Sequence, residues 1–316
     1  MAVIFAKAPG KIILFGEHAV VYGQPAIAIP VNKVSATARV IPNLDTDPGN
    51  VRIQAPDIQL DSALSELPLD HPIATAVRLV QNASEVDTLP GITLQISSTI
   101  PMAAGMGSSA AISIAIIRAL SDFLGASLSA DQVSTLAYQV EKIQHGTPSG
   151  IDNNVISHQK PVYFIRDEPV EHLEIEAPTY WVIADSGEKT PTRETVADVR
   201  KLYDSDPERL GELFNQIGTI TQNARASLIK GDVDKLGHLM NANQNLLEQI
   251  NLNSPALQHL INTARKAGAK GAKLSGGGRG GNIIALASAD NIDQIERALL
   301  NAGAKHVITT LLNKAR

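Results

Sequence analysis

Stretches rich in valine, isoleucine and threonine recur in the first half of the chain and predict β-strands at residues 2–6, 11–15, 26–31, 34–41 and 92–100. Residues 108–124 differ because they are apolar on nearly every helical face, which predicts a buried central helix. A second helix is predicted to start after Ser129, which forms a capping-box pattern with Gln132, and to stop at His145. Residues 42–72 follow neither period and are predicted to form an irregular excursion.

The pattern changes after Pro178, where one strand at residues 179–186 is followed by a group of helices. These helices are predicted near residues 192–203, 208–229, 232–250 and 256–267. Strands at 271–275 and 282–287, a helix at 290–302 and a strand at 304–311 complete the chain. Grouped strands and grouped helices favour an α+β fold over regular βαβ alternation. We therefore expect two domains, residues 1–179 and 180–316.

Composition narrows the class of protein. The 316 residues are 44% hydrophobic and include no cysteine, which is typical of a globular chain and excludes disulfide scaffolds, thiolate metal sites and thiol nucleophiles. The net charge is 27 − 32 = −5 with no basic stripe, so neither nucleic acid nor membrane is an expected partner. The N-terminus lacks a signal-peptide pattern and no apolar run reaches the ~18 residues of a membrane span, so we expect a cytoplasmic protein.

A glycine-rich segment, Pro101–Ala111, joins a predicted strand to the buried helix. Gly105 and Gly107 allow a tight turn without a Cβ, and Ser108 and Ser109 open the helix with unpaired amides and a favourable dipole. Together these features predict a cradle for phosphate groups.

The same segment has two competing interpretations. The spacing formally matches a dinucleotide-binding fingerprint, but the helix is followed by another helix where a strand is required. An ordinary glycine turn capped by serine stays open as an alternative.

A second glycine-rich segment covers Gly276–Gly281, which contains five glycines in six positions. It lies between two predicted strands, so dinucleotide binding again fails, and a hairpin turn needs only one or two glycines. A loop that closely approaches a substrate or phosphate fits this composition, and a flexible surface loop is the alternative. The Walker pattern GxxxxGK[ST] does not occur in the chain.

Five charged or titratable residues are candidates for chemistry. Lys11, Glu17 and His18 lie in an apolar stretch, where charges are costly unless they are paired or exposed. Glu141 borders the apolar face of its helix and points inwards or, alternatively, into solvent beside its lysine neighbour. Asp152 ends a loop of turn-forming residues, where a helix cap is as common as a functional acid.

Four segments resemble signatures of the GHMP small-molecule kinases. Pro9–Gly23 (PGKIILFGEHAVVYG) resembles the first signature in the form that mevalonate kinases carry, and Pro101–Ala111 resembles the phosphate loop with Met106 at a common leucine position. His145–Asn153 resembles the mevalonate kinase segment HGTPSGIDN. Lys273–Leu286 resembles the third signature, with departures at Ser275, Gly277 and Arg279. The resemblance therefore covers essentially the whole chain.

The resemblance implies a two-domain GHMP kinase fold, with an N-terminal α+β nucleotide-binding domain and a C-terminal ferredoxin-like domain. It implies transfer of a phosphoryl group from ATP to the primary hydroxyl of mevalonate, giving 5-phosphomevalonate, with Mg²⁺ as cofactor. The implied catalytic residues are Asp152 and Lys11, and the implied substrate contacts are Glu17, His18 and Asp152. The implied metal ligands are Ser108 and Glu141. The ATP phosphates would be bound by Pro101, Met102, Ala103, Ala104, Gly105, Met106, Gly107, Ser108, Ser109, Ala110 and Ala111, with Gly276, Gly277 and Gly278 closing over them.

Further roles accompany this resemblance. Ser186 or Thr190 is an additional candidate for substrate contact, Arg279 adds a charge that the common pattern lacks, and a homodimer is left open. Phosphomevalonate kinase or another GHMP kinase is the nearest alternative function, although the segment from Glu17 to Tyr22 argues against it. A related ATP-dependent decarboxylase and an inactive nucleotide-binding relative stay open as well, and retention of Lys11 and Asp152 argues against the inactive one.

Overall fold

The computed structural model describes residues 2–101, 105–145, 148–188, 190 and 192–314. The chain forms two compact units, and neither is one continuous stretch. The first unit contains Met1–Lys11, Pro30–Pro101 and Met106–Gln159, and the second contains Ile12–Ile29, Met102–Gly105 and Lys160–Arg316. The single division predicted near residue 179 stays a prediction.

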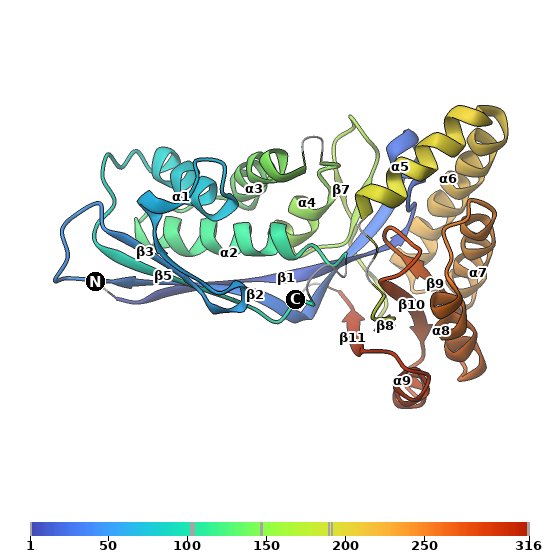
Figure 1. Ribbon diagram of the computed structural model, residues 1–316. Coiled ribbons are helices and arrows are strands. Elements are labelled where there is room, and N and C mark those ends of the chain that lie inside the picture. Colours follow the sequence, from blue (N-terminus) through green and yellow to red (C-terminus); the bar gives the residue numbers. More distant parts are fainter. Residues whose placement is uncertain (1, 102–104, 146–147, 189, 191, 315–316) are drawn as a thin grey trace. The chain divides into compact units, whose positions relative to one another are not determined.

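The first unit is built on a mixed sheet (Figure 1). Its strands are β1 (Ile4–Phe15) and β2 (Ala26–Pro42), which both continue into the second unit, and β3 (Val51–Ala55), β4 (Leu60–Ala63) and β5 (Ile92–Ser98). They follow the order β4–β3–β5–β2, with β1 paired to β2, and β3 is parallel to β5. Two short 3-10 helices, η2 (Pro56–Ile58) and η3 (Leu64–Glu66), flank β4.

Four helices cover one face of this sheet (Figure 1). They are α1 (Pro72–Ala83), α2 (Ser108–Phe123), α3 (Ala130–His145) and α4 (Ile151–His158). The prediction of a buried α2 is confirmed, since Ile114, Ile116 and Ile117 point in different directions and are all 0% exposed. The capping box of α3 is confirmed as well, because the Gln132 amide donates to Ser129 Oγ and the Ser129 amide donates to Gln132 Oε1.

The first two strands are longer than predicted. Pro9-Gly10 does not interrupt β1, because β1 is hydrogen-bonded on one side to β2 among the described strands, and an edge strand tolerates a proline that lacks an N–H. Likewise β2 continues through Asn32 and Lys33, whose exposed side chains interrupt the apolar pattern but not the backbone pairing.

The prediction of an irregular segment at residues 42–72 is wrong. This segment contains β3 and β4, and the helix α1 that follows it has no counterpart among the predicted elements. Strand β3 pairs with β4 on one side and with β5 on the other. Because β5 lies beyond α1 in the sequence, the pairing that joins β3 to the rest of the sheet is not visible in its local pattern.

The second unit contains a four-stranded antiparallel sheet in the order β11–β8–β10–β9. Its strands are β8 (Thr179–Asp185), β9 (Gly271–Ser275), β10 (Asn282–Ala287) and β11 (His306–Leu312). Helices α5 (Thr192–Ser205), α6 (Pro207–Lys230), α7 (Val233–Gln249) and α8 (Pro255–Lys266) connect β8 to β9, and α9 (Ile292–Asn301) connects β10 to β11. This β-α-β-β-α-β order and strand arrangement confirm the predicted ferredoxin-like domain.

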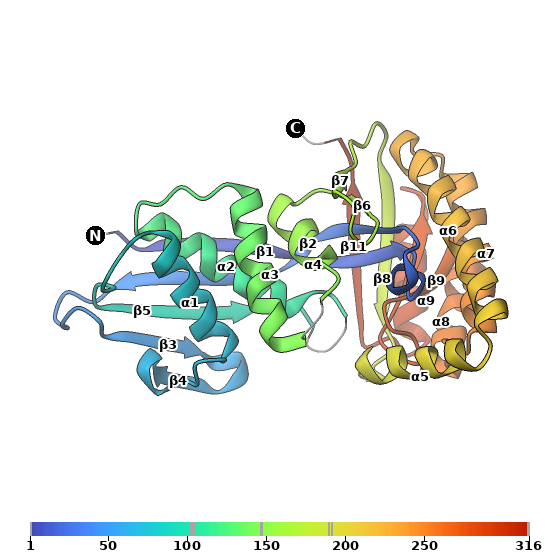
Figure 2. The ribbon, with the colours of Figure 1, turned by 90° about the horizontal axis from the view of Figure 1, so that it is seen from above.

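The helices of the second unit pack on the sheet through one apolar core. Alternate strand residues such as Val182, Ala184, Ile283 and Ala285 face this core, which is the period expected of a strand. Helices α6 and α7 run side by side (Figures 1 and 2), and α7 and α8 contact β9 and β10. The 3-10 helix η1 (Ala19–Tyr22) joins the core through Ala19. The short strand β6 (Val162–Phe164) pairs with the first residues of β2, and β7 (Glu171–His172) pairs with β6. None of the described helices has both the length and the apolar character needed to span a membrane.

Candidate active site

A glycine turn leads into α2, as the sequence predicts. Gly105 and Gly107 have φ values of 68° and 71°, which glycine adopts without strain. Gly107 is the N-cap of α2 and no side chain caps the helix, so the alternative of a serine-capped turn does not hold. The first amides of the helix therefore point outwards without a helical partner, which is the arrangement that binds an anion. Residues 102–104, which are also predicted to bind ATP, lie outside the described part of the chain.

Lys11 and Asp152 meet beside this turn. The Lys11 ammonium lies 3.1 Å from Asp152 Oδ1, and their side chains are 7% and 30% exposed. The Lys11 amide donates to the carbonyl of Met106 over 3.0 Å. A Cβ added to Gly107 would lie 3.0 Å from Lys11 Cγ and 3.3 Å from Asp152 Oδ2, so only glycine leaves room there. A buried cation and a partly exposed carboxylate thus lie next to a helix N-terminus.

Asp152 lies on a helix, where the sequence predicts a loop. The helix α4 begins at Ile151 after Gly150, whose φ of 88° turns the chain into the helix. Asn153 is buried and its amide nitrogen donates to Ser134 Oγ over 2.8 Å and to the Ser134 carbonyl over 3.2 Å. These bonds attach the first turn of α4 to α3 and set the direction in which Asp152 points.

Glu141 points inwards, which is one of the two predicted orientations. It is 6% exposed, and the Ser109 hydroxyl donates to its Oε1 over 2.7 Å. Its neighbour Lys142 is exposed and lies over the ring of Tyr138. The hydrogen bond places the Glu141 carboxylate at the first turn of α2, where the predicted ligand Ser108 precedes Ser109 in the chain. The described residues include no cluster of three His, Cys, Asp or Glu side chains that would hold a metal by themselves.

Glu17 forms a buried ion pair with Lys273 in the second unit. Both side chains are 0% exposed, and the Lys273 ammonium also donates to the Leu274 carbonyl over 2.6 Å. Burial lowers the pKa of Lys273, while the charge of Glu17 opposes this shift. The tight turn before Glu17 requires glycine, because a Cβ on Gly16 would lie 2.3 Å from the Pro25 carbonyl oxygen.

His18 contacts the second glycine loop. Its Nε2 lies 2.8 Å from the Gly277 carbonyl oxygen. Burial lowers the pKa of His18 to about 4, the hydrogen bond to Gly277 opposes this shift, and the charge of Arg279 adds to it. The imidazole is therefore neutral near pH 7, and Nε2 donates its proton to the carbonyl.

The remaining candidates also lie in the second unit. Thr190 Oγ1 donates to the Arg279 carbonyl over 2.7 Å, and the Ser186 amide donates to the Gly281 carbonyl over 2.9 Å. Arg279 pairs with Asp198. The predictions that Ser186 or Thr190 contacts substrate stay predictions.

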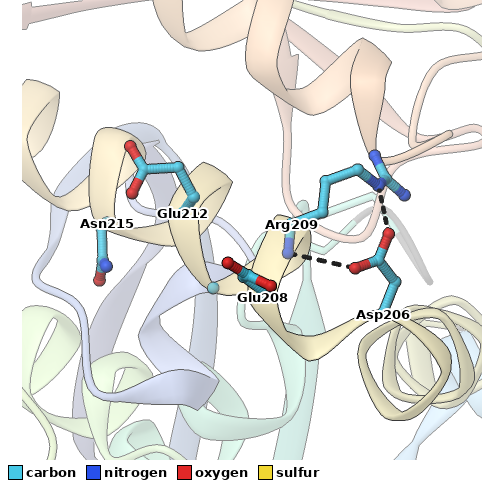
Figure 3. A pocket seen from close by; sticks show the side chains of 6 residues that line it. Asp206, Glu208, Arg209, Glu212 and Asn215 are labelled. Atoms are coloured by element: carbon cyan, nitrogen blue, oxygen red, sulfur yellow. Dashed lines mark hydrogen bonds and ion pairs between the residues drawn. The ribbon is translucent and has the colours of Figure 1, made fainter.

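Two surface hollows are lined by other residues than these pairs. One, of about 560 Å³, is formed at the start of α6 by Asp206, Glu208, Arg209, Gly211, Glu212 and Asn215 (Figure 3). Its only cation, Arg209, is paired with Asp206, so its acidic lining does not suit phosphate. The other, of about 290 Å³, is lined by polar residues of α3 and the start of α4, including Ser134 and Asn153.

The sequence carries no local signal for the roles of Ser134, Asn153 and Asp198, because each acts through a partner distant in sequence. Lys273 stands out there only as the start of a signature. A lysine inside the apolar strand GAKLS was nevertheless a signal for a buried partner.

Comparison with known proteins identifies the class. The family model described as "GHMP kinases N terminal domain" matches residues 71–159. The model described as "GHMP kinases C terminal" matches residues 224–305. The chain therefore belongs to the GHMP kinase family.

Several mevalonate kinases within this family match nearly the full chain. The chain is 36% identical to a mevalonate kinase of Pyrococcus abyssi, over 98% of this chain and 95% of that protein. It is 35% identical to a mevalonate kinase of Thermococcus sibiricus, over 98% and 96% respectively. Among solved structures, mevalonate kinase of L. major in complex with R-mevalonate is 31% identical with a TM-score of 0.83, covering 100% of this chain and 97% of that one.

Proposed function

We propose that this chain is an ATP-dependent kinase that phosphorylates the primary hydroxyl of mevalonate to give 5-phosphomevalonate. The proposal rests on one observation above all: Lys11 and Asp152 form an ion pair against Gly107, at the uncapped N-terminus of α2. Full-length similarity to mevalonate kinases supports the choice of substrate.

Asp152 is the group suited to accept the proton of the attacking hydroxyl. Its carboxylate is partly exposed, so a substrate can reach it, and the Lys11 ammonium lies 3.1 Å from its Oδ1. Lys11 is nearly buried, and its ammonium would lose its compensating carboxylate if it left the pair, so its charge is held where negative charge develops on the transferred group. Phosphoryl transfer depends mainly on positioning and electrostatics, and these two residues supply both.

The phosphates of ATP are assigned to residues 101–111 and the amides at the start of α2. The donors present fit Mg²⁺, which prefers hard oxygen ligands, needs one or two carboxylates and completes its shell with phosphate oxygens and water. Ser108 and Glu141 would hold the ion, with the Ser109 hydroxyl orienting the carboxylate. When bound, the ion neutralises charge on the nucleotide phosphates.

The remaining assignments concern the second unit. His18 is proposed at the mevalonate end of the site, and Gly276, Gly277 and Gly278 at the nucleotide phosphates. Because Glu17 is fully buried in its pair with Lys273, its proposed part at the mevalonate end is to support His18 rather than to contact substrate directly. The hydrogen bond from His18 to the Gly277 carbonyl supports a joint role for the two segments.

An ADP-release assay with mevalonate, phosphomevalonate, homoserine and galactose tests the function. We expect turnover with mevalonate alone, with phosphomevalonate and ADP as products. Turnover with another alcohol would replace the substrate, release of CO₂ would indicate a decarboxylase, and binding of ATP without turnover would indicate an inactive relative.

A further inference from the structure

Arg279 stands in the middle of the second glycine loop, at a position where the family signature has no cation. Its side chain is held at both ends of the guanidinium. Nη1 lies 2.7 Å from Asp198 Oδ2 on α5, and Nε donates to the Asn251 carbonyl over 3.0 Å. The guanidinium therefore binds two segments of the second unit that flank the loop.

The backbone of Arg279 is held as firmly as its side chain. Its amide donates to the Leu252 carbonyl over 2.8 Å, and its carbonyl accepts from Thr190 Oγ1 over 2.7 Å. Its φ is 57°, a conformation that costs a non-glycine residue about 1 kcal/mol or more unless the surroundings impose it.

The neighbouring glycines are close to the backbone of Leu252 and of Glu188, which precedes α5. A Cβ on Gly278 would lie 2.3 Å from the Leu252 carbonyl oxygen, and one on Gly280 would lie 2.8 Å from that of Glu188. The Gly281 amide donates to the Glu188 carbonyl over 2.9 Å. The loop is thus fixed by contacts that need no ligand.

We propose that Arg279 is a positioning residue that holds the loop Gly276–Gly281 in one conformation before nucleotide binds, and that it is not itself a phosphate ligand. A glycine-rich segment loses much conformational entropy when it is ordered, and an anchor that orders it beforehand removes that cost from binding. The use of this loop for nucleotide rests on the proposed function, whereas its fixed conformation does not.

The alternative is that Arg279 binds a nucleotide phosphate directly. The arginine would then have to leave Asp198 and Asn251, so Asp198 would compete with the ligand for the guanidinium. The two roles therefore predict opposite effects of removing the charge of Asp198.

Steady-state kinetics of Arg279→Gly, Asp198→Asn and the double variant separate the roles. Glycine tolerates the positive φ, so the first variant removes the anchor without adding strain. We expect each single variant to raise the KM for ATP about fivefold, the range of a partly exposed ion pair, with kcat within about twofold. The double variant should be no worse than the larger single effect, because both remove one interaction.

Lys201→Ala is the matched control, because Lys201 also pairs with Asp198 from the same helix. It should leave the KM for ATP unchanged. An Asp198→Asn variant with an unchanged or lowered KM, beside a raised KM for Arg279→Gly, would show direct phosphate binding and overturn the proposal.

Hydrogen exchange of the Gly281 amide in the nucleotide-free protein gives a second, independent measurement. We expect exchange about fivefold faster in both variants and unchanged in Lys201→Ala. Unchanged exchange in both anchor variants would overturn the proposal. A wild-type protein inactive on mevalonate would instead refute the proposed function and leave this measurement valid.

Discussion

Two lysine–carboxylate pairs in this chain have opposite surroundings. In the pair of Lys11 and Asp152 the carboxylate side chain is 30% exposed. In the pair of Lys273 and Glu17 both side chains are 0% exposed. The first pair lies beside a glycine turn and an uncapped helix N-terminus, and the second lies inside the second unit.

The difference shows why a charge pair alone does not identify a catalytic centre. A carboxylate that exchanges protons with substrate must be reached by it, and Asp152 meets this condition. A fully buried pair is costly to desolvate and yields little net stability, but removing one partner leaves an uncompensated charge in the protein interior. We therefore expect a substitution in the first pair to reduce activity and a substitution in the second pair to reduce stability.

Asp152→Asn should give the largest effect. The amide keeps the shape of the side chain but cannot accept the proton, so kcat should fall about 10³-fold while the KM for ATP changes less than about threefold. Steady-state kinetics measure both values, and Asp131→Asn, an exposed aspartate on α3, is the control. Near-normal turnover would show that the proton goes elsewhere.

Lys273→Met tests the buried pair. It removes the ammonium that pairs with the Glu17 carboxylate in the interior, so the free energy of unfolding should fall by about 3–5 kcal/mol, as measured by urea denaturation. Lys160→Met is the control, because Lys160 forms an exposed pair with Glu174 and should cost at most about 1 kcal/mol. Adding Glu17→Gln should restore part of the loss. A variant as stable as the wild type would mean that the pair adds nothing to folding.

The sequence predicted elements whose pattern is local. The helix α2 is apolar all round and α3 has a capping box, so both could be identified without knowledge of their neighbours. Strand β3 is stabilised by β5 across an intervening helix, and the short helix α4 depends on the Asn153–Ser134 bonds. Neither partner can be found from a local period.

The same distinction applies to the candidate site. Charged residues in apolar stretches and glycines before a helix were visible in the sequence, and the family resemblance gave them roles. Their partners were not visible: the pairing of Glu17 with Lys273 joins residues 256 positions apart, and that of Arg279 with Asp198 spans 81.

His18 makes the surroundings of the buried pair sensitive to pH. Its pKa is about 4 in the folded protein against 6.5 as a free side chain, because burial disfavours the charged form. Below about pH 6.5 the unfolded chain binds a proton at His18 that the folded protein does not. The contribution of His18 to the free energy of unfolding is therefore fully present above that pH and is lost as the pH falls towards 4. The loss is about 3 kcal/mol, since one pKa unit corresponds to about 1.4 kcal/mol.

Urea denaturation of His18→Asn between pH 4 and pH 7 measures this contribution. Asparagine keeps an N–H donor for the Gly277 carbonyl and has no group that titrates in this range, so it removes mainly the titration. The variant should show a flatter dependence on pH than the wild type, and His306→Asn, at an exposed position, should not. Equal slopes in the wild type and His18→Asn would refute the shift.

Glu141 gives the smallest expected effect and adds a third inward-pointing carboxylate to the comparison. It accepts a hydrogen bond from the Ser109 hydroxyl at the start of α2. Glu141→Gln keeps an oxygen for the Ser109 hydroxyl but removes the charge, so the Mg²⁺ concentration for half-maximal velocity should rise about tenfold. Ser109→Ala should raise it less, because the carboxylate loses its orientation but keeps its charge. An Mg²⁺ requirement unchanged in Glu141→Gln would place this carboxylate with the buried structural pair rather than with Asp152.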